Sequence, residues 1–131
     1  MRAIKIYHPP GRDAPYETFL ASLDPKLRLK LRRQLFLLAY SPQIELKEPH
    51  YKRFSLERYS SFCELREKHQ ILVRIIFTMY DGDILLLTPF VKKEKRDTMK
   101  ALERSIRMLA EVREHPDYAV NYNFWEETKK P

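Results

Sequence analysis

The residues of this sequence with the clearest chemical potential are the lysines and arginines between residues 52 and 96. Eight of them form the candidate set, and most of these lie on or beside a predicted sheet: Lys52, Arg53, Arg66, Arg74, Lys92, Lys93, Lys95 and Arg96. Cations that converge on one face of a sheet can bind a phosphate backbone. They can also stabilise the extra negative charge of a phosphorane while a neighbouring 2′-hydroxyl attacks, a reaction that needs no metal ion and no strong base. The residues alone do not separate binding from catalysis.

Other kinds of catalysis find little support. The four histidines show no metal-ligand spacing, and Cys63, the single cysteine, has no thiol partner, so we predict neither a zinc site nor an intrachain disulfide. There is no glycine-rich phosphate loop, no GxSxG elbow, and no carboxylate pair placed for glycosidase or two-metal chemistry. We therefore expect neither a metal nor a cofactor.

Arg74 lies in a predicted hairpin around which the rest of the chain is organised. Asp81-Gly82 separates two apolar runs, which is the pattern of a two-residue turn. The turn predicts three cross-strand pairs: Thr78–Leu85, Ile76–Leu87 and Arg74–Pro89. Alternation then gives one continuously apolar face: Ile71, Val73, Ile75, Phe77, Met79, Ile84, Leu86, Thr88 and Phe90.

The opposite face of this hairpin is mostly apolar, and Arg74 interrupts it. Lys93 would project from the same face as Arg74 if the strand continues to residue 93. Arg74 could belong to a functional site. It could also extend its charge to solvent at the sheet edge, or pair with a nearby carboxylate.

Before the hairpin, the sequence predicts a short strand at residues 3–7 and helices at 16–23 and 26–39. Asp24-Pro25 provides the N-cap and first residue of the second helix. Its basic residues form a charged face: Lys26, Arg28, Lys30, Arg32 and Arg33. That face is a solvated surface, a phosphate-tracking surface or a docking face for an acidic partner.

The remaining elements are strands at 50–54 and 61–66, a connector at 67–70, and a helix after the hairpin. Asp97 or Thr98 can cap that helix, and its predicted buried stripe is Met99, Leu102, Ile106, Leu109 and Val112. Pro116 ends it, and we expect the aromatic residues of the tail, 118–131, to fold back on the body. This order predicts an α+β domain, with an N-terminal strand and two helices packed on a mostly antiparallel sheet of four or five strands, and a C-terminal helix.

Length and charge narrow the class of protein. The 131 residues suit a single domain spanning 1–131, and 25 Lys and Arg against 18 Asp and Glu give a net charge of +7. This excess favours a polyanionic partner, with nucleic acid first, then acidic protein, then anionic membrane. The first residues lack a signal-peptide core, and no apolar run approaches the roughly 20 residues that span a bilayer. We therefore expect a soluble cytoplasmic protein without a membrane partner.

Several motifs occur in an order that resembles the RelE/HigB superfamily of type II toxins. They are Glu64-Leu65-Arg66, Arg74 inside a β-run, Asp81-Gly82-Asp83, and ILLLTPFVKK at residues 84–93. The resemblance covers residues 4–118 and is closest to the branch of phage-derived HigB-like toxins. In addition, Pro49-His50-Tyr51-Lys52 resembles the proline-and-lysine stretch before the ELR strand, and the helix after Asp24-Pro25 resembles the family's second helix.

The resemblance implies a metal-independent endoribonuclease that cuts messenger RNA, usually on the ribosome, and is silenced by a small antitoxin. We expect that antitoxin to be a helix-turn-helix protein. By this match Arg74 is the phosphate-stabilising arginine, and Lys93 is a second cation with Lys92 beside it. Arg66 is the arginine of the ELR motif and Lys52 the upstream basic residue. We assign Lys52, Arg53, Lys95 and Arg96 to RNA binding.

The chain also departs from the family pattern. Pro89 replaces the usual glycine, and Lys95-Arg96-Asp97-Thr98 stands in place of a KTP-like stretch. Met99 lies near the position of a catalytic tyrosine in some relatives, so proton transfer would fall to Lys92, Lys93 or His50. Two alternatives therefore stay open. One is a catalytically weak relative that binds RNA or ribosomes, or acts as co-repressor with its antitoxin. The other is a basic interaction protein.

Overall fold

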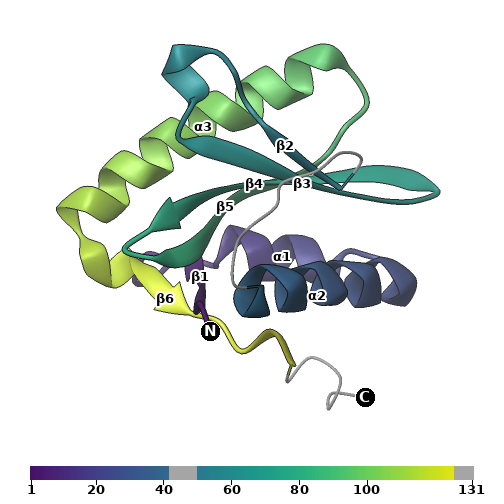
Figure 1. Ribbon diagram of the computed structural model, residues 1–131, viewed down its shortest axis with the longest axis horizontal. Helices are drawn as coiled ribbons and strands as arrows, with labels where there is room; N and C mark the ends of the chain where they lie inside the picture. The colour runs from purple at the N-terminus through teal and green to yellow at the C-terminus, as the bar shows by residue number, and fades with distance from the viewer. Residues whose placement is uncertain (42–49, 126–131) are drawn as a thin grey trace.

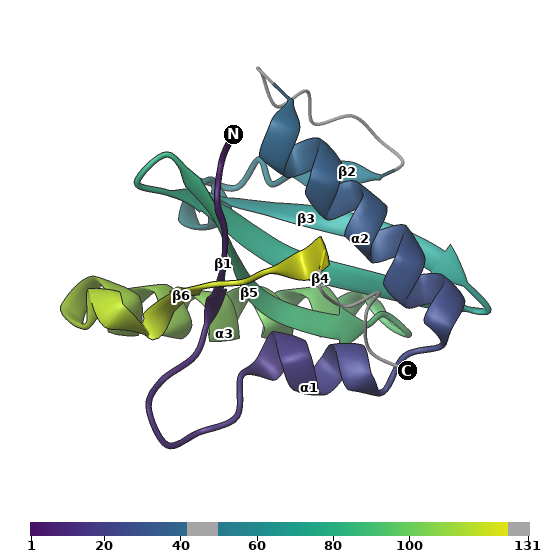
Figure 2. The same ribbon diagram turned by 90° about the horizontal axis from the view of Figure 1, so that it is seen from below.

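The computed structural model describes residues 1–41 and 50–125, in which one sheet lies between two layers of helices (Figure 1). The helices are α1 (Pro15–Ala21), α2 (Pro25–Tyr40) and α3 (Lys95–Glu114), with short 3-10 turns η1 (Glu57–Tyr59) and η2 (Pro116–Tyr118). The strands are β1 (Ile4–Tyr7), β2 (Tyr51–Arg53), β3 (Phe62–His69), β4 (Ile71–Tyr80), β5 (Asp83–Val91) and β6 (Ala119–Asn121). Figures 1 and 2 show α1 and α2 on one face of the sheet and α3 on the other.

The predicted α+β class is confirmed. The strand order is β2-β3-β4-β5-β1-β6, and β1 runs parallel to β5 while the other neighbours are antiparallel. The sheet has six strands rather than four or five, because residues 119–121 of the predicted tail pair with β1. None of the helices in the described part of the chain is long and apolar enough to cross a bilayer.

The hairpin of β4 and β5 turns where the sequence predicted. Asp81 and Gly82 have φ values of 50° and 80°, both in the left-handed region that a two-residue turn requires. The predicted pair of Thr78 and Leu85 is confirmed. The predicted pairing of Arg74 with Pro89 is wrong, because Arg74 lies opposite Phe90.

The difference comes from a β-bulge beyond the Phe77–Leu86 pair, where β5 contains one more residue than β4. An inserted residue changes the face on which the following side chains project. Thr88 and Phe90 therefore face α3 instead of joining the predicted apolar face, and the Thr88 hydroxyl lies 2.7 Å from that of Ser105 on α3. The strand ends at Val91, so Lys93 does not continue it.

Other boundaries also differ from the predictions. β3 runs to His69 and turns into β4 at Gln70, so most of the predicted connector at 67–70 is strand. The long β4 supplies backbone partners as far as Ile71, and this extends the ladder. Similarly, α3 begins at Lys95 after Glu94, which forms a reciprocal capping box with Asp97.

Each face of the sheet has its own apolar core. Leu27, Leu31 and Leu35 of α2 pack with the inward residues of the strands beneath α1 and α2. The core beneath α3 contains these residues of the helix: Ala101, Leu102, Met108, Leu109 and Val112. The predicted burial of Met99 on α3 is wrong. Its side chain is 44% exposed, because it lines a cavity near the start of the helix.

The N-cap prediction for α2 is confirmed, since the Asp24 side chain accepts a hydrogen bond from the Lys26 amide. The described part of the tail folds back as expected. Phe124 is 1% exposed and meets the ring of Phe36 edge to face at 4.7 Å.

Candidate functional site

Adjacent strands bring predicted cations onto one face of the sheet. Lys52 on β2 lies opposite Glu64 on β3, and Arg66 on β3 lies opposite Arg74 on β4. Arg74 in turn lies opposite Phe90 on β5. Opposite and alternate residues of a sheet share a face, so all five project from the side on which α3 packs. We call Lys52, Arg66 and Arg74, with Glu64 among them, the cationic cluster.

Glu64 holds the two arginines of this cluster. Its side chain is 1% exposed, and its Oε1 atom lies 2.8 Å from Arg66 Nε and 3.5 Å from Arg74 Nε. Arg74 Nε makes no hydrogen bond within the described part of the chain, so charge is its main link to Glu64. Burial lowers the pKa of Arg74 from its usual value; Glu64 opposes this shift and the neighbouring Arg66 adds to it. Arginine stays protonated under such conditions, so the pair keeps one positive charge in excess of the carboxylate.

A cavity of about 480 Å³ adjoins the cluster at Lys52 and extends to the first turn of α3. Its apolar lining is Phe54, Leu56, Tyr59, Met99 and Leu102. Its cationic lining is Lys52, Lys92, Lys95 and Arg96. Aromatic faces beside cations suit a single-stranded nucleic acid, whose bases stack while its phosphates meet the positive charges.

The structure brings together most of the predicted site residues, but not all. Lys92 lines the cavity. Lys93 lies beyond the strand, where its amide donates to Asp97 at 2.9 Å, and it does not line the cavity. Arg53 is opposite Cys63 in the ladder, so it projects from the face that packs on α2. The structure therefore groups Lys92, rather than Lys93, with the cavity cations.

His50 and Tyr59 are the aromatic residues nearby that can exchange a proton. His50 Nδ1 lies 3.8 Å from Glu67, whose carboxylate also accepts a hydrogen bond from Gln34 of α2. His50 is thus engaged toward α2, away from the cavity. The Tyr59 hydroxyl donates to Glu103 at 2.6 Å, and this bond is the largest cause of its raised pKa. Lys52, Lys92 and Lys95 contribute the ammonium groups that line the cavity, and Lys52 also belongs to the cationic cluster.

Sequence reasoning named Glu64 only as part of the Glu64-Leu65-Arg66 motif, and it did not single out Phe54 or Tyr59. The signal for Glu64 was present, since it alternates with Arg66 in a strand and therefore shares its face. Phe54 and Tyr59 approach α3 only through the fold of the segment between β2 and β3, for which the sequence carries no comparable pattern. Pro49, part of the proline-and-lysine stretch, lies outside the described residues.

The ordering of helices and strands, with a cationic face on a mainly antiparallel sheet, is consistent with a RelE-like fold. Residues 18–113 match the family described as "Phage derived protein Gp49-like (DUF891)", and the chain belongs to this family, which is related to RelE/HigB-type toxins. No curated protein and no solved structure matches the chain significantly. Among residues 1–41 and 50–125, no group of three or more His, Cys, Asp or Glu side chains is placed to hold a metal ion.

Proposed function

We propose that this protein is the toxin of a type II toxin–antitoxin system and cuts messenger RNA on the ribosome, in the cytoplasm, without a metal ion. Its family supports the toxin assignment. One observation carries the nuclease assignment: Glu64 holds Arg66 and Arg74 side by side, next to a cavity lined by Lys52 and Lys92. In this proposal a small helix-turn-helix antitoxin silences the enzyme.

In the proposed reaction, a ribose 2′-oxygen attacks the adjacent phosphorus and the bond to the 5′-oxygen breaks. The products carry a 2′,3′-cyclic phosphate and a 5′-hydroxyl. A solvent water takes the proton of the 2′-hydroxyl. The leaving 5′-oxygen gains a proton from a lysine ammonium group, which solvent then reprotonates. Arg66 and Arg74 stabilise the charge that develops on the phosphorane, which a preorganised cation does without rearranging in the transition state. The ammonium group of Lys92 or Lys52 supplies the proton to the leaving oxygen.

Arg74→Ala tests the proposal. Translating ribosomes with a defined messenger RNA are incubated with each variant, free RNA is incubated separately in excess chelator, and the new ends are mapped. We expect the parent protein to produce 5′-hydroxyl and cyclic-phosphate ends. We expect Arg74→Ala to lower the rate by about 10²–10³-fold, as for loss of one transition-state donor. Arg113→Ala is the matched control, because this exposed arginine near the end of α3 lines neither the cluster nor the cavity.

Undiminished cutting by Arg74→Ala would remove this residue from the site. Metal-dependent cleavage that leaves 3′-hydroxyl ends would contradict the proposed reaction.

A second candidate function is a catalytically weak module that binds RNA or ribosomes, or acts as co-repressor with a DNA-binding antitoxin. The specific observation in its favour is the commitment of the Tyr59 hydroxyl to Glu103, with Met99 near the position of a tyrosine in some relatives. Binding of uncut messenger RNA or ribosomes, with no new RNA ends, would support this candidate. An adjacent reading frame for a helix-turn-helix protein would support both toxin-related functions over a general basic interaction protein.

A further inference from the structure

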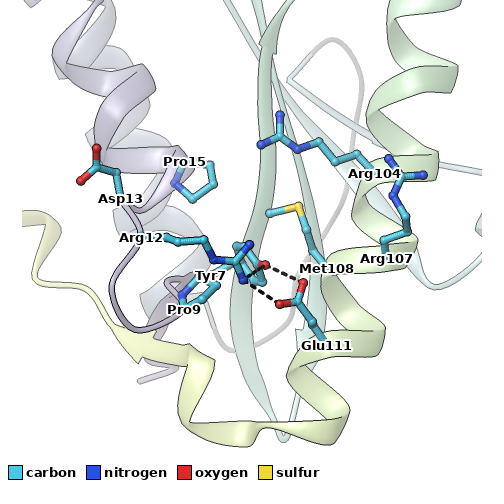
Figure 3. Close-up of a pocket in the computed structure, with 9 residues that line it drawn as sticks. All are labelled: Tyr7, Pro9, Arg12, Asp13, Pro15, Arg104, Arg107, Met108 and Glu111. Atoms are coloured by element: carbon cyan, nitrogen blue, oxygen red, sulfur yellow. Dashed lines mark hydrogen bonds and ion pairs between the residues drawn. The ribbon is translucent and has the colours of Figure 1, made fainter.

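A second cavity, of about 330 Å³, lies between α3 and the segment that joins β1 to α1 (Figure 3). At one end of this cleft, the Tyr7 hydroxyl donates to Glu111 at 2.8 Å and Arg12 donates to the same carboxylate at 2.8 Å. These two hydrogen bonds are the main causes of a lowered pKa of Glu111. The negative charge of Glu111 is therefore already compensated within the wall of the cleft.

Two further arginines of the lining, Arg104 and Arg107, have no ion-pair partner among the described residues. Figure 3 shows the Arg104 side chain extending from α3 across the cleft, with Arg107 beside it. Asp13, the other carboxylate of the lining, is turned away from them in the same view. The cleft thus presents two guanidinium groups that form no ion pair within the described part of the chain.

These arginines continue a stripe that starts at the first cavity. Arg96 lines that cavity, Lys100 and Arg104 line a depression beside the end of β5, and Arg104 and Arg107 line the cleft. At 100° per residue, positions 96, 100, 104 and 107 fall on one side of a helix. With a rise of 1.5 Å per residue, the stripe is about 16 Å long.

One carboxylate compensates the stripe directly, since Glu94, the N-cap of α3, forms an ion pair with Arg96. The other carboxylates nearby form their hydrogen bonds with groups outside the stripe. The Asp97 carboxylate accepts hydrogen bonds from the backbone amides of Lys93 and Glu94. Glu103 binds Arg58 and Tyr59, and Glu111 binds Tyr7 and Arg12. Lys100, Arg104 and Arg107 thus form no ion pair within the described part of the chain, and Asp97 and Glu103 attract Lys100 and Arg107 only from beyond ion-pair distance. These three cations remain for an external partner.

We propose that Arg96, Lys100, Arg104 and Arg107 bind successive phosphates of an RNA strand that leaves the first cavity and enters the cleft. This inference rests on the proposed function, since the RNA is the substrate held at the cationic cluster. An acidic protein is the less favoured occupant. Stable protein interfaces usually centre on buried aromatic or apolar anchors, whereas Met108 is the large apolar α3 side chain lining the cleft and is itself buried in the core.

The test measures binding of two non-cleavable 2′-O-methyl RNAs, of 3 and 12 nucleotides, over a series of salt concentrations. The variants are Arg104→Gln, Arg107→Gln and the double variant, with Arg113→Gln as a matched arginine control on α3. We expect the double variant to bind the 12-mer more weakly, with a salt slope reduced by about 1.4, which is about 0.7 for each lost phosphate contact. Binding of the 3-mer should be unchanged, and Arg113→Gln should behave as the parent.

The outcomes separate this inference from the function on which it rests. The double variant could bind the 12-mer as the parent does while Arg74→Ala binds it more weakly. That result would overturn the proposal that the stripe binds RNA, and it would leave the nuclease proposal unaffected. Failure of the parent protein to bind either RNA would overturn the proposed RNA path, whereas the nuclease proposal would still be decided by the ribosome cleavage assay. Binding of a polyglutamate peptide that depends on Arg104 and Arg107, without an effect on RNA, would assign the stripe to an acidic protein and overturn the RNA path. Thermal unfolding of each variant checks that these exposed substitutions leave the fold intact.

Discussion

The carboxylate of Glu64 holds together two guanidinium groups that would otherwise repel each other. It is 1% exposed, while the side chains of Arg66 and Arg74 are 19% and 12% exposed. Taking these charges out of water costs free energy, which their mutual attraction offsets only while all partners are present. Glu64 is therefore the positioning residue of the cationic cluster, and the arginines are the groups that would meet a phosphate.

Glu64→Gln should lower the free energy of unfolding by about 3 kcal/mol, because it removes the carboxylate that both partly buried guanidinium groups share. Urea unfolding measures this loss, and Glu57→Gln, at an exposed position, provides a control that should change stability by less than about 0.5 kcal/mol. A loss below about 1 kcal/mol for Glu64→Gln would show that the carboxylate does not hold the pair.

At the scale of elements, the bulge in β5 decides which side chains reach α3. It turns Thr88 and Phe90 toward the helix and places Lys92 at the cavity. Thr88 and Ser105 are both buried, and their hydroxyl groups bond to each other across the interface. Burying a hydroxyl group without a hydrogen-bond partner costs more free energy than one hydrogen bond contributes. The Thr88–Ser105 pair therefore stabilises the bulged register of β5 against α3.

Thr88→Val should lower the free energy of unfolding by about 1–2 kcal/mol, because it leaves the Ser105 hydroxyl unsatisfied. The double variant Thr88→Val/Ser105→Ala removes both polar partners and should recover much of the loss. Chemical unfolding of the parent, both single variants and the double variant measures the interaction energy between the two hydroxyl groups. Simple additivity of the two single effects would mean that the hydroxyls do not interact.

The contact of α3 with η1 should depend on pH through Glu103. Hydrogen bonds from Arg58 and Tyr59 lower the pKa of Glu103 to about 2 from 4.5. A lowered folded-state pKa gives stability that is complete above the unfolded value and is lost as the pH falls toward the folded one. The melting temperature of Glu103→Gln should therefore lie below that of the parent at pH 5–7, and the gap should narrow between about pH 4.5 and 2.

Melting curves of the two proteins over this pH range measure the effect. Glu114→Gln, at an exposed position of the same helix, should show no such narrowing. A gap that stays constant down to pH 3 would contradict the role of the ionised Glu103 carboxylate.

At the scale of the whole molecule, two helical layers stabilise the sheet while leaving the cationic cluster beside the first turn of α3. The described part of the tail completes this arrangement, since β6 pairs with β1 and Phe124 packs against α2. The cationic cluster, the first cavity and the stripe on α3 form neighbouring positive surfaces.

Phe124→Ala should lower the free energy of unfolding by about 3–5 kcal/mol, because it empties a buried aromatic position. Leu37→Ala, at a residue of α2 that is 57% exposed, is the control and should have a small effect. Urea unfolding of both variants compares them. A loss below about 1 kcal/mol for Phe124→Ala would mean that the tail is not part of the core.

The sequence by itself determined the features that depend on near neighbours. Asp81-Gly82 specified the turn because both residues tolerate positive φ, and Asp24-Pro25 specified the start of α2 through its cap. Alternation also placed Arg66 and Arg74 in strands, and the order of elements indicated the α+β class. Only the tertiary structure decided that Lys92 rather than Lys93 lines the cavity, that Glu64 joins the arginines, and that residues 119–121 extend the sheet. The physical reason is that a bulge, a shared ion pair and a distant strand pairing are set by contacts between different elements. Alternation within one strand can give the face on which Glu64 lies but not its partners.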